Sequence, residues 1–216
     1  MGMNTTTDVT RPHVRLYRYL KAEHAIAAIE HRNLRVSRLT DLNDPFEFEQ
    51  FEYLVEGYSD KFGIICFSDA KTLPDPVIWS HYTDGHKGFA LGFDVQISDA
   101  LFPMTYPKMR PRLNRGEIEK MDSAHRKKKI MRSFSAKARN WKYEAETRLL
   151  IILSLCQMSG GDYFTPIPDD FLKHVILGIR CTISRSYVEN ALKQYGFKDV
   201  TITKARRSSS EFKVII

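Results

Sequence analysis

The chain has 216 residues, 43% of them hydrophobic and 27% charged, and a net charge of +7. This balance is ordinary for a globular protein with one full core, and the length is marginal for two domains. The longest apolar run, residues 149–156, is too short to cross a bilayer, which needs about 20 residues. Three cysteines beside apolar runs predict free thiols in a reducing compartment. Composition thus predicts a disordered tail over 1–13 and one cytoplasmic domain over 14–216, and it argues against a membrane-spanning or disulfide-rich protein.

The predicted elements alternate between strands and helices. Short apolar or alternating segments predict strands over 14–20, 34–39, 62–69 and 88–95. Between them, helical spacing predicts a helix over 21–33 with Asn33 as its C-cap, and one or two helical turns over 75–88. The second half predicts a long helix over 117–140, a strand over 146–155 buried on both faces, and a helical turn feeding a strand over 169–179. It ends with a helix over 183–197, begun by Ser184 and stopped by Gly196, and strands over 200–205 and 212–216.

About eight strands and four helices in this irregular order predict an α+β fold with a mixed, mostly antiparallel sheet. A doubly wound parallel sheet does not fit the order. The chain carries no GxGxxG, no P-loop and no CxxC pair, the motifs of dinucleotide folds and zinc sites.

The positive charge is concentrated in one segment. Residues 108–142 hold thirteen Lys and Arg against three acids, a net charge of +10, so the rest of the chain is net negative. One interpretation is a nucleic-acid contact through Arg126, Lys127, Lys128 and Lys129. The other is the solvated face of an amphipathic helix, because apolar residues recur at helical spacing from Ile130 to Trp141. The solvated face is the favoured interpretation.

Two glutamates, Glu144 and Glu146, lie at the start of the predicted strand over 146–155. Residues two apart share a face of a strand, so Glu144, Glu146 and Arg148 are expected to point the same way. Neighbouring carboxylates repel each other, and burial adds to the free-energy cost of ionising both, so the pKa of at least one should rise unless a cation lies close by. The alternative is an edge-strand ion pair between Glu146 and Arg148, which is common and contributes little.

Aromatic and cationic residues elsewhere suit a planar ligand that carries phosphates. Arg18 lies between Tyr17 and Tyr19, and the segment "WSHYTDGH" groups aromatic residues with histidines. Each of these also has a structural interpretation as a core aromatic or a hydrogen-bonding histidine.

The segments "NDPFE", "WSHYTDGHKGF" and "WKYEAETR" together resemble the bacterial domain-of-unknown-function family numbered 2971, and the resemblance extends from about Leu16 to the last strand. More distantly, the chain resembles ADP-ribosyltransferase-like domains, in which a mixed-sheet core carries an Arg or His on the first strand and a glutamate opening a later one. The resemblance implies NAD as substrate and a role as a toxin or anti-phage effector. It implies Glu146 and Glu144 as the catalytic carboxylates. The implied NAD-binding residues are Arg18, Tyr19, Ser37, Ser68, Trp79, His81, Tyr82 and Arg148.

The leading hypothesis is therefore an ADP-ribosyltransferase-like enzyme or NAD glycohydrolase, in which Glu146 stabilises an oxocarbenium-like transition state. One alternative is a metal-dependent nuclease with Asp44, Glu144 and Glu146 as its acids. Another is a non-catalytic nucleic-acid-binding module that uses the basic helix over 117–140.

Overall fold

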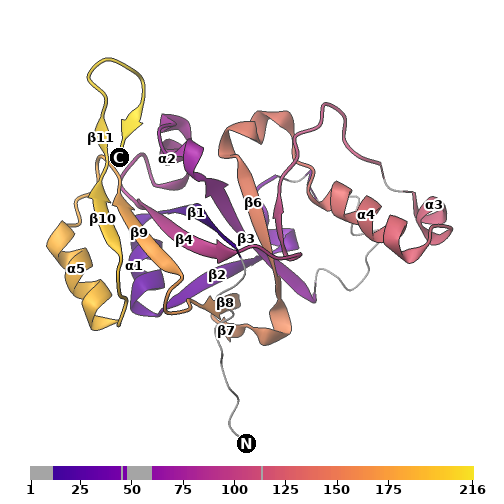
Figure 1. Ribbon diagram of the computed structural model, residues 1–216, viewed down its shortest axis with the longest axis horizontal. Coiled ribbons are helices and arrows are strands. Elements are labelled where there is room, and N and C mark those ends of the chain that lie inside the picture. The colour runs from indigo at the N-terminus through magenta and orange to yellow at the C-terminus, as the bar shows by residue number, and fades with distance from the viewer. Residues whose placement is uncertain (1–11, 45, 48–59, 113) are drawn as a thin grey trace, which may run out of the picture.

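Ten strands joined in one sheet organise the computed structural model, which describes residues 12–44, 46–47, 60–112 and 114–216 (Figure 1). The first six strands are β1 (His13–Leu20), β2 (Asn33–Arg38), β3 (Phe62–Asp69), β4 (Phe89–Gln96), β5 (Leu101–Pro103) and β6 (Glu146–Ile152). They are followed by β7 (Gln157–Ser159), β8 (Asp162–Pro166), β9 (Leu172–Leu177) and β10 (Thr201–Lys204). A separate two-stranded hairpin, β11 (Arg206–Arg207) and β12 (Val214–Ile215), ends the chain.

The strand order is β10-β9-β4-β1-β3-β2-β8-β7, with β6 paired to β3 and β5 paired to β6. The pairs are antiparallel apart from the parallel pair of β9 and β10. The protein is therefore a single α+β domain with a mostly antiparallel mixed sheet, as the sequence predicts.

Helices cover both faces of the sheet. Neighbouring residues of a strand point to opposite faces, so each strand contributes to two cores. Leu16 of β1 packs into the larger core, with the helices α1 (Ala22–Glu30) and α5 (Arg185–Gln194). Tyr17 and Tyr19 face the other side and pack with α2 (Pro76–Tyr82). Ser184 caps α5 by accepting a hydrogen bond from the Tyr187 amide, as predicted.

The predicted helix over 117–140 is wrong, since this segment forms three shorter elements. They are α3 (Arg115–Glu119), α4 (Ser123–Phe134) and a 3₁₀ helix over Arg139–Glu144. Asp122 causes the break, because its carboxylate accepts hydrogen bonds from the amides of Ala124 and His125 and so starts a new helix. Phe134 still packs into a third core cluster beneath α4, so the apolar spacing is real over the shorter length.

Two other predicted boundaries are wrong. The first helix ends at Glu30, and Arg32, with φ of 49°, turns the chain so that Asn33 starts β2 and does not cap the helix. The predicted strand over 146–155 ends at Ile152, which is 47% exposed, so it is not buried on both faces. A 3₁₀ turn over Leu153–Leu155 follows it.

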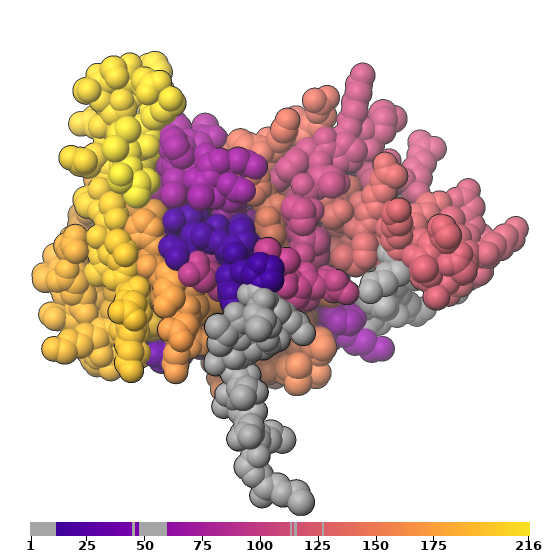
Figure 2. Space-filling model, in the orientation of Figure 1, coloured from indigo at the N-terminus to yellow at the C-terminus, as the bar shows by residue number. Residues whose placement is uncertain are grey.

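Most of the predicted tail over 1–13 lies outside the described residues, and β1 already begins at His13. In the space-filling view, the yellow C-terminal hairpin and the red segment of α3 and α4 occupy opposite sides of the molecule (Figure 2). Across the described chain, no helix has the length and apolar character to cross a membrane. The three cysteines are free thiols, and Cys181 is the most buried of them.

Candidate functional site

The sheet forks at one edge of β3. β1 pairs with β3 only at the end of β3, where Tyr17 lies opposite Ser68, and β2 pairs with β3 only near its start, where Ser37 lies opposite Ile64. The edge of β3 between these two pairings, which includes Cys66, borders a pocket of about 270 Å³. The pocket therefore sits where β1 and β2 separate.

This pocket brings together eight of the ten residues predicted for the site. Strands β1, β2, β3 and β6, the helix α2 and the 3₁₀ helix over Arg139–Glu144 all contribute to its lining. The eight predicted residues are Arg18, Tyr19, Ser37, Ser68, Tyr82, Glu144, Glu146 and Arg148. Because they come from both halves of the chain, only the folded sheet can assemble them.

Glu144 and Glu146 converge for a reason that differs from the prediction. Glu144 is the last residue of a 3₁₀ helix and Glu146 is the first residue of β6, so the two do not share a strand face. Ala145 between them has φ of 41° and ψ of 51°, a left-handed conformation that is unusual for a residue with a Cβ. This turn directs both carboxylates to one ammonium group, that of Lys137.

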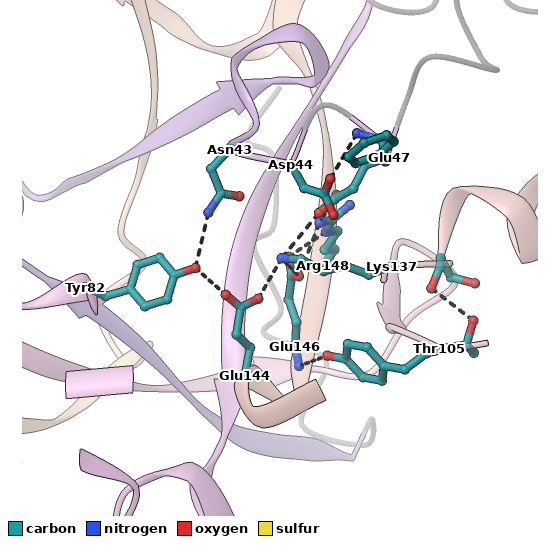
Figure 3. Close-up of polar contacts among 12 residues, drawn as sticks. Asn43, Asp44, Glu47, Tyr82, Thr105, Lys137, Glu144, Glu146 and Arg148 are labelled. Atoms are coloured by element: carbon teal, nitrogen blue, oxygen red, sulfur yellow. Dashed lines mark hydrogen bonds and ion pairs between the residues drawn. The ribbon is translucent and has the colours of Figure 1, made fainter. Parts of the chain in front are cut away.

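Three glutamates and two cations form a buried cluster beside the pocket (Figure 3). The Nζ of Lys137 lies 2.6 Å from Glu144 Oε2, 2.8 Å from Glu146 Oε2 and 3.3 Å from Glu47 Oε1. Arg148 donates from Nε to Glu146 Oε1 at 2.6 Å and from Nη2 to Glu47. All five side chains are between 1% and 6% exposed, so the attraction acts in a poorly solvated environment.

The two cations keep Glu146 ionised. Burial opposes its ionisation, yet Arg148 and Lys137 together lower the pKa of Glu146 to about 2. For Glu47 the balance is reversed, since burial outweighs the same two cations and raises its pKa. Burial lowers the pKa of Lys137, but the three surrounding carboxylates outweigh it and raise that pKa above its ordinary value. The cluster thus presents a carboxylate at Glu146 that stays charged at neutral pH.

Tyr82 connects the cluster to the pocket. Its hydroxyl donates a hydrogen bond to Glu144 Oε1 and accepts one from Asn43 Nδ2 at 3.3 Å (Figure 3). Burial and the negative charge of Glu144 raise the pKa of Tyr82, so its phenol remains protonated. A neutral phenol and a charged carboxylate therefore stand side by side on one wall.

Arg18 is a half-buried cation that makes no ion pair with any carboxylate in the described ranges. Its Nη1 donates to the carbonyl oxygen of Arg35 at 2.9 Å, a bond that bridges β1 and β2 across the fork. Burial, and to a smaller extent the charge of Arg35, lower the pKa of Arg18 to about 10. A cation held in a pocket without a counter-charge suits an anionic ligand.

Two predicted residues lie elsewhere. Trp79 is completely buried, its Nε1 donates to the Leu73 carbonyl at 2.8 Å, and its ring packs edge-on against Tyr19, so it has no face free to stack on a ligand. His81 lies outside the pocket and its Nδ1 contacts the Tyr143 hydroxyl at 2.9 Å. For Tyr19, which does line the pocket, the hydroxyl is bound to Thr72 Oγ1.

Sequence reasoning missed Lys137 and Glu47, the other two charged members of the cluster. In the sequence, Lys137 falls among the lysines of the predicted basic helix, which are expected on its solvated face. Its neighbours Ala136 and Ala138, between Phe134 and Trp141, were the available sign that it is enclosed. Glu47 ends the segment "NDPFE", whose Asn, Asp and Pro are typical of a turn and give no sign that the glutamate is buried.

The basic residues of α4 have mainly structural contacts. Arg126 donates three hydrogen bonds to carbonyl oxygens around the end of α3, and Lys129 lies 2.8 Å from Glu117. Lys128 is exposed, and the side chain of Lys127 lies outside the described part of the chain. Among the residues that the structure describes, no group of His, Cys, Asp or Glu is arranged to hold a metal ion. In the cluster, the ammonium of Lys137 occupies the space between Glu144 and Glu146.

Comparison with known proteins gives no relative: no protein-family model, no curated protein and no solved structure matches the chain. The resemblance to the family numbered 2971, and the more distant one to ADP-ribosyltransferase-like domains, therefore stay predictions.

Proposed function

We propose that this protein is an ADP-ribosyltransferase-like enzyme or NAD glycohydrolase that breaks the bond between nicotinamide and ribose in NAD. The observation that carries the proposal is the pocket at the fork of the sheet, which unites Arg18, Tyr82, Glu144 and Glu146. These residues supply a cation that can bind an anion, an aromatic ring and a carboxylate that stays ionised at neutral pH within one cavity.

The chemistry requires the groups that line this pocket. When the bond between the nicotinamide nitrogen and C1′ of the ribose breaks, the electron pair leaves with nicotinamide and positive charge spreads over C1′ and the ring oxygen. An ionised carboxylate near the ribose stabilises that charge, and the low pKa of Glu146 keeps it ionised. As the new bond to C1′ forms, Glu144 is placed to accept the proton of the attacking acceptor or water.

The size of the pocket suggests how NAD would be divided. A volume of about 270 Å³ is below the range of roughly 300–1,000 Å³ typical of sites that enclose a whole ligand. A neighbouring groove of about 820 Å³, between α1, β2 and the β7–β8 hairpin, shares Arg18 and Leu20 with the pocket. The nicotinamide riboside would occupy the pocket, Arg18 would contact the diphosphate at the junction, and the adenosine would lie in the groove.

The test is nicotinamide release from NAD by the purified protein, measured together with NAD binding by isothermal titration. Glu146→Gln should abolish release, because the uncharged amide cannot stabilise the developing cation. Tyr82→Phe removes one hydroxyl and serves as a second, milder variant that should reduce release while the protein stays folded. Glu189→Gln, which changes an exposed ion pair with Arg185, is the matched control and should keep full activity. A folded wild-type protein that neither binds NAD nor releases nicotinamide would refute the proposal.

A further inference from the structure

A second pocket, of about 450 Å³, lies on the other side of the buried cluster. Lys137 lines both pockets, and Glu47, which is paired with Arg148, lines the second one. The two cavities are therefore separated by a wall of charged side chains. Nothing in the proposed reaction requires this second pocket.

The rim of the second pocket is basic and aromatic. Lys108, Arg110 and Arg139 line it, and Lys108 and Arg139 are exposed and make no ion pair with any residue in the described ranges. Phe46 is 64% exposed, and the guanidinium of Arg110 lies 5.9 Å from the centre of its ring. An exposed ring accompanied by cations is the arrangement on which unpaired bases stack while their phosphates are neutralised.

Asp44 gives the pocket an unused hydrogen-bond acceptor. It is 5% exposed, and its Oδ1 accepts from the Phe46 amide at 2.9 Å. Its Oδ2 is buried and has no hydrogen-bond partner among the described residues. A buried carboxylate oxygen without a donor costs free energy unless a ligand or water supplies one. The amino group of a nucleobase is such a donor.

We infer that this second pocket binds one nucleotide of a single-stranded nucleic acid. The base stacks on Phe46 and donates its amino group to Asp44, and the phosphates on either side contact Lys108, Arg110 and Arg139. A duplex does not fit these contacts, because its bases are stacked on one another and cannot also stack on Phe46. This places nucleic-acid binding at the pocket and not on the basic face of α4. The inference does not depend on the proposed cleavage of NAD.

The experiment measures fluorescence anisotropy of short labelled single strands of cytidine and thymidine nucleotides, and of a duplex, over a range of salt concentrations. The protein should prefer the single strands, and cytidine, which has an exocyclic amino group, over thymidine. Phe46→Ala should weaken single-strand binding by about fivefold or more. Arg139→Ala should reduce the slope of log K against log salt by about 0.7, the effect of one phosphate contact.

The controls separate this site from general charge. Lys128→Ala removes an exposed lysine of α4 and should leave the affinity unchanged, and Asp44→Asn should abolish the preference for cytidine. Equal binding of duplex and single strand, with no effect of Phe46→Ala, would overturn the inference. If an acidic peptide bound as tightly as the single strands, and Phe46→Ala abolished that binding, the inference would be overturned in favour of a protein partner. Because none of these measurements involves NAD, failure of the nucleic-acid inference can be told apart from failure of the proposed function.

Discussion

The ammonium of Lys137 and the carboxylate of Glu146 lie 2.8 Å apart, and neither side chain is more than 4% exposed. A buried ion pair of this kind stabilises a fold only when its remaining hydrogen-bonding groups are also occupied. Here Glu146 also receives Arg148, and Lys137 also contacts Glu144 and Glu47. The contribution of each of these charged side chains to stability therefore depends on the other members of the cluster.

Lys137→Met tests that interdependence. The substitution leaves three buried glutamates with Arg148 as the remaining cation of the cluster, so the free energy of unfolding should fall by about 3–5 kcal/mol. Urea denaturation measures the change. Lys142→Met is the matched control, because Lys142 lies on the neighbouring 3₁₀ helix with an exposed side chain, and it should change the free energy by less than about 0.5 kcal/mol. Equal effects of the two substitutions would show that the cluster does not stabilise the fold.

The low pKa of Glu146 predicts a defined loss of stability in acid. A carboxyl group whose pKa is lower in the folded than in the unfolded protein contributes stability above its unfolded pKa and loses it as the pH falls. For Glu146 this loss should extend from its ordinary value of 4.5 down to about 2 and amount to on the order of 3 kcal/mol. The raised pKa of Glu47 has the opposite effect on stability as the pH falls, so the measurement must separate the contribution of Glu146 from that of Glu47.

Urea denaturation of wild type and Glu146→Gln at a series of acidic pH values makes that comparison. The variant lacks the titrating group, so its free energy of unfolding should fall less steeply than that of wild type over this range. Parallel curves would mean that Glu146 has the same pKa in the folded and unfolded protein.

Local patterns in the sequence predict the fold class, and together with the resemblance to ADP-ribosyltransferase-like domains they name eight of the residues that line the pocket. The alternation of apolar and polar residues in β1, and the capping Ser184 before α5, are visible in the sequence. The fork in the sheet is not visible there, since it depends on which strand pairs with which edge of β3. The sequence therefore predicts some of the residues that line the pocket, but it does not predict where in the sheet the pocket lies.

The charge cluster shows a second limit of the sequence. Glu144, Ala145 and Glu146 were expected to continue one strand, because nothing in the sequence signals that Ala145 adopts a left-handed conformation that glycine or asparagine more often fills. Lys137 was hidden among twelve other basic residues of the same segment. Charge counts treat all lysines as solvated, and only the folded structure shows which one is enclosed.

Arg18 gives the prediction that best separates ligand binding from stability. Burial disfavours its charge, and no carboxylate of the described chain compensates it. Arg18→Met should therefore raise the free energy of unfolding by on the order of 1 kcal/mol, even though the hydrogen bond to Arg35 is lost. The same substitution should weaken NAD binding about tenfold or more, because a charged contact with the diphosphate disappears.

Arg15→Met is the matched control on the same strand. Arg15 lies next to Asp94, with its Nη2 2.9 Å from Asp94 Oδ2, so its loss should lower stability slightly and leave NAD binding unchanged. Urea denaturation and isothermal titration with NAD measure both properties for both variants. If Arg18→Met destabilised the protein and bound NAD as wild type does, Arg18 would be a structural bridge between β1 and β2 and not a ligand-binding residue. A more stable variant with weakened NAD binding would identify Arg18 as a cation that the fold retains at a cost in stability because the ligand requires it.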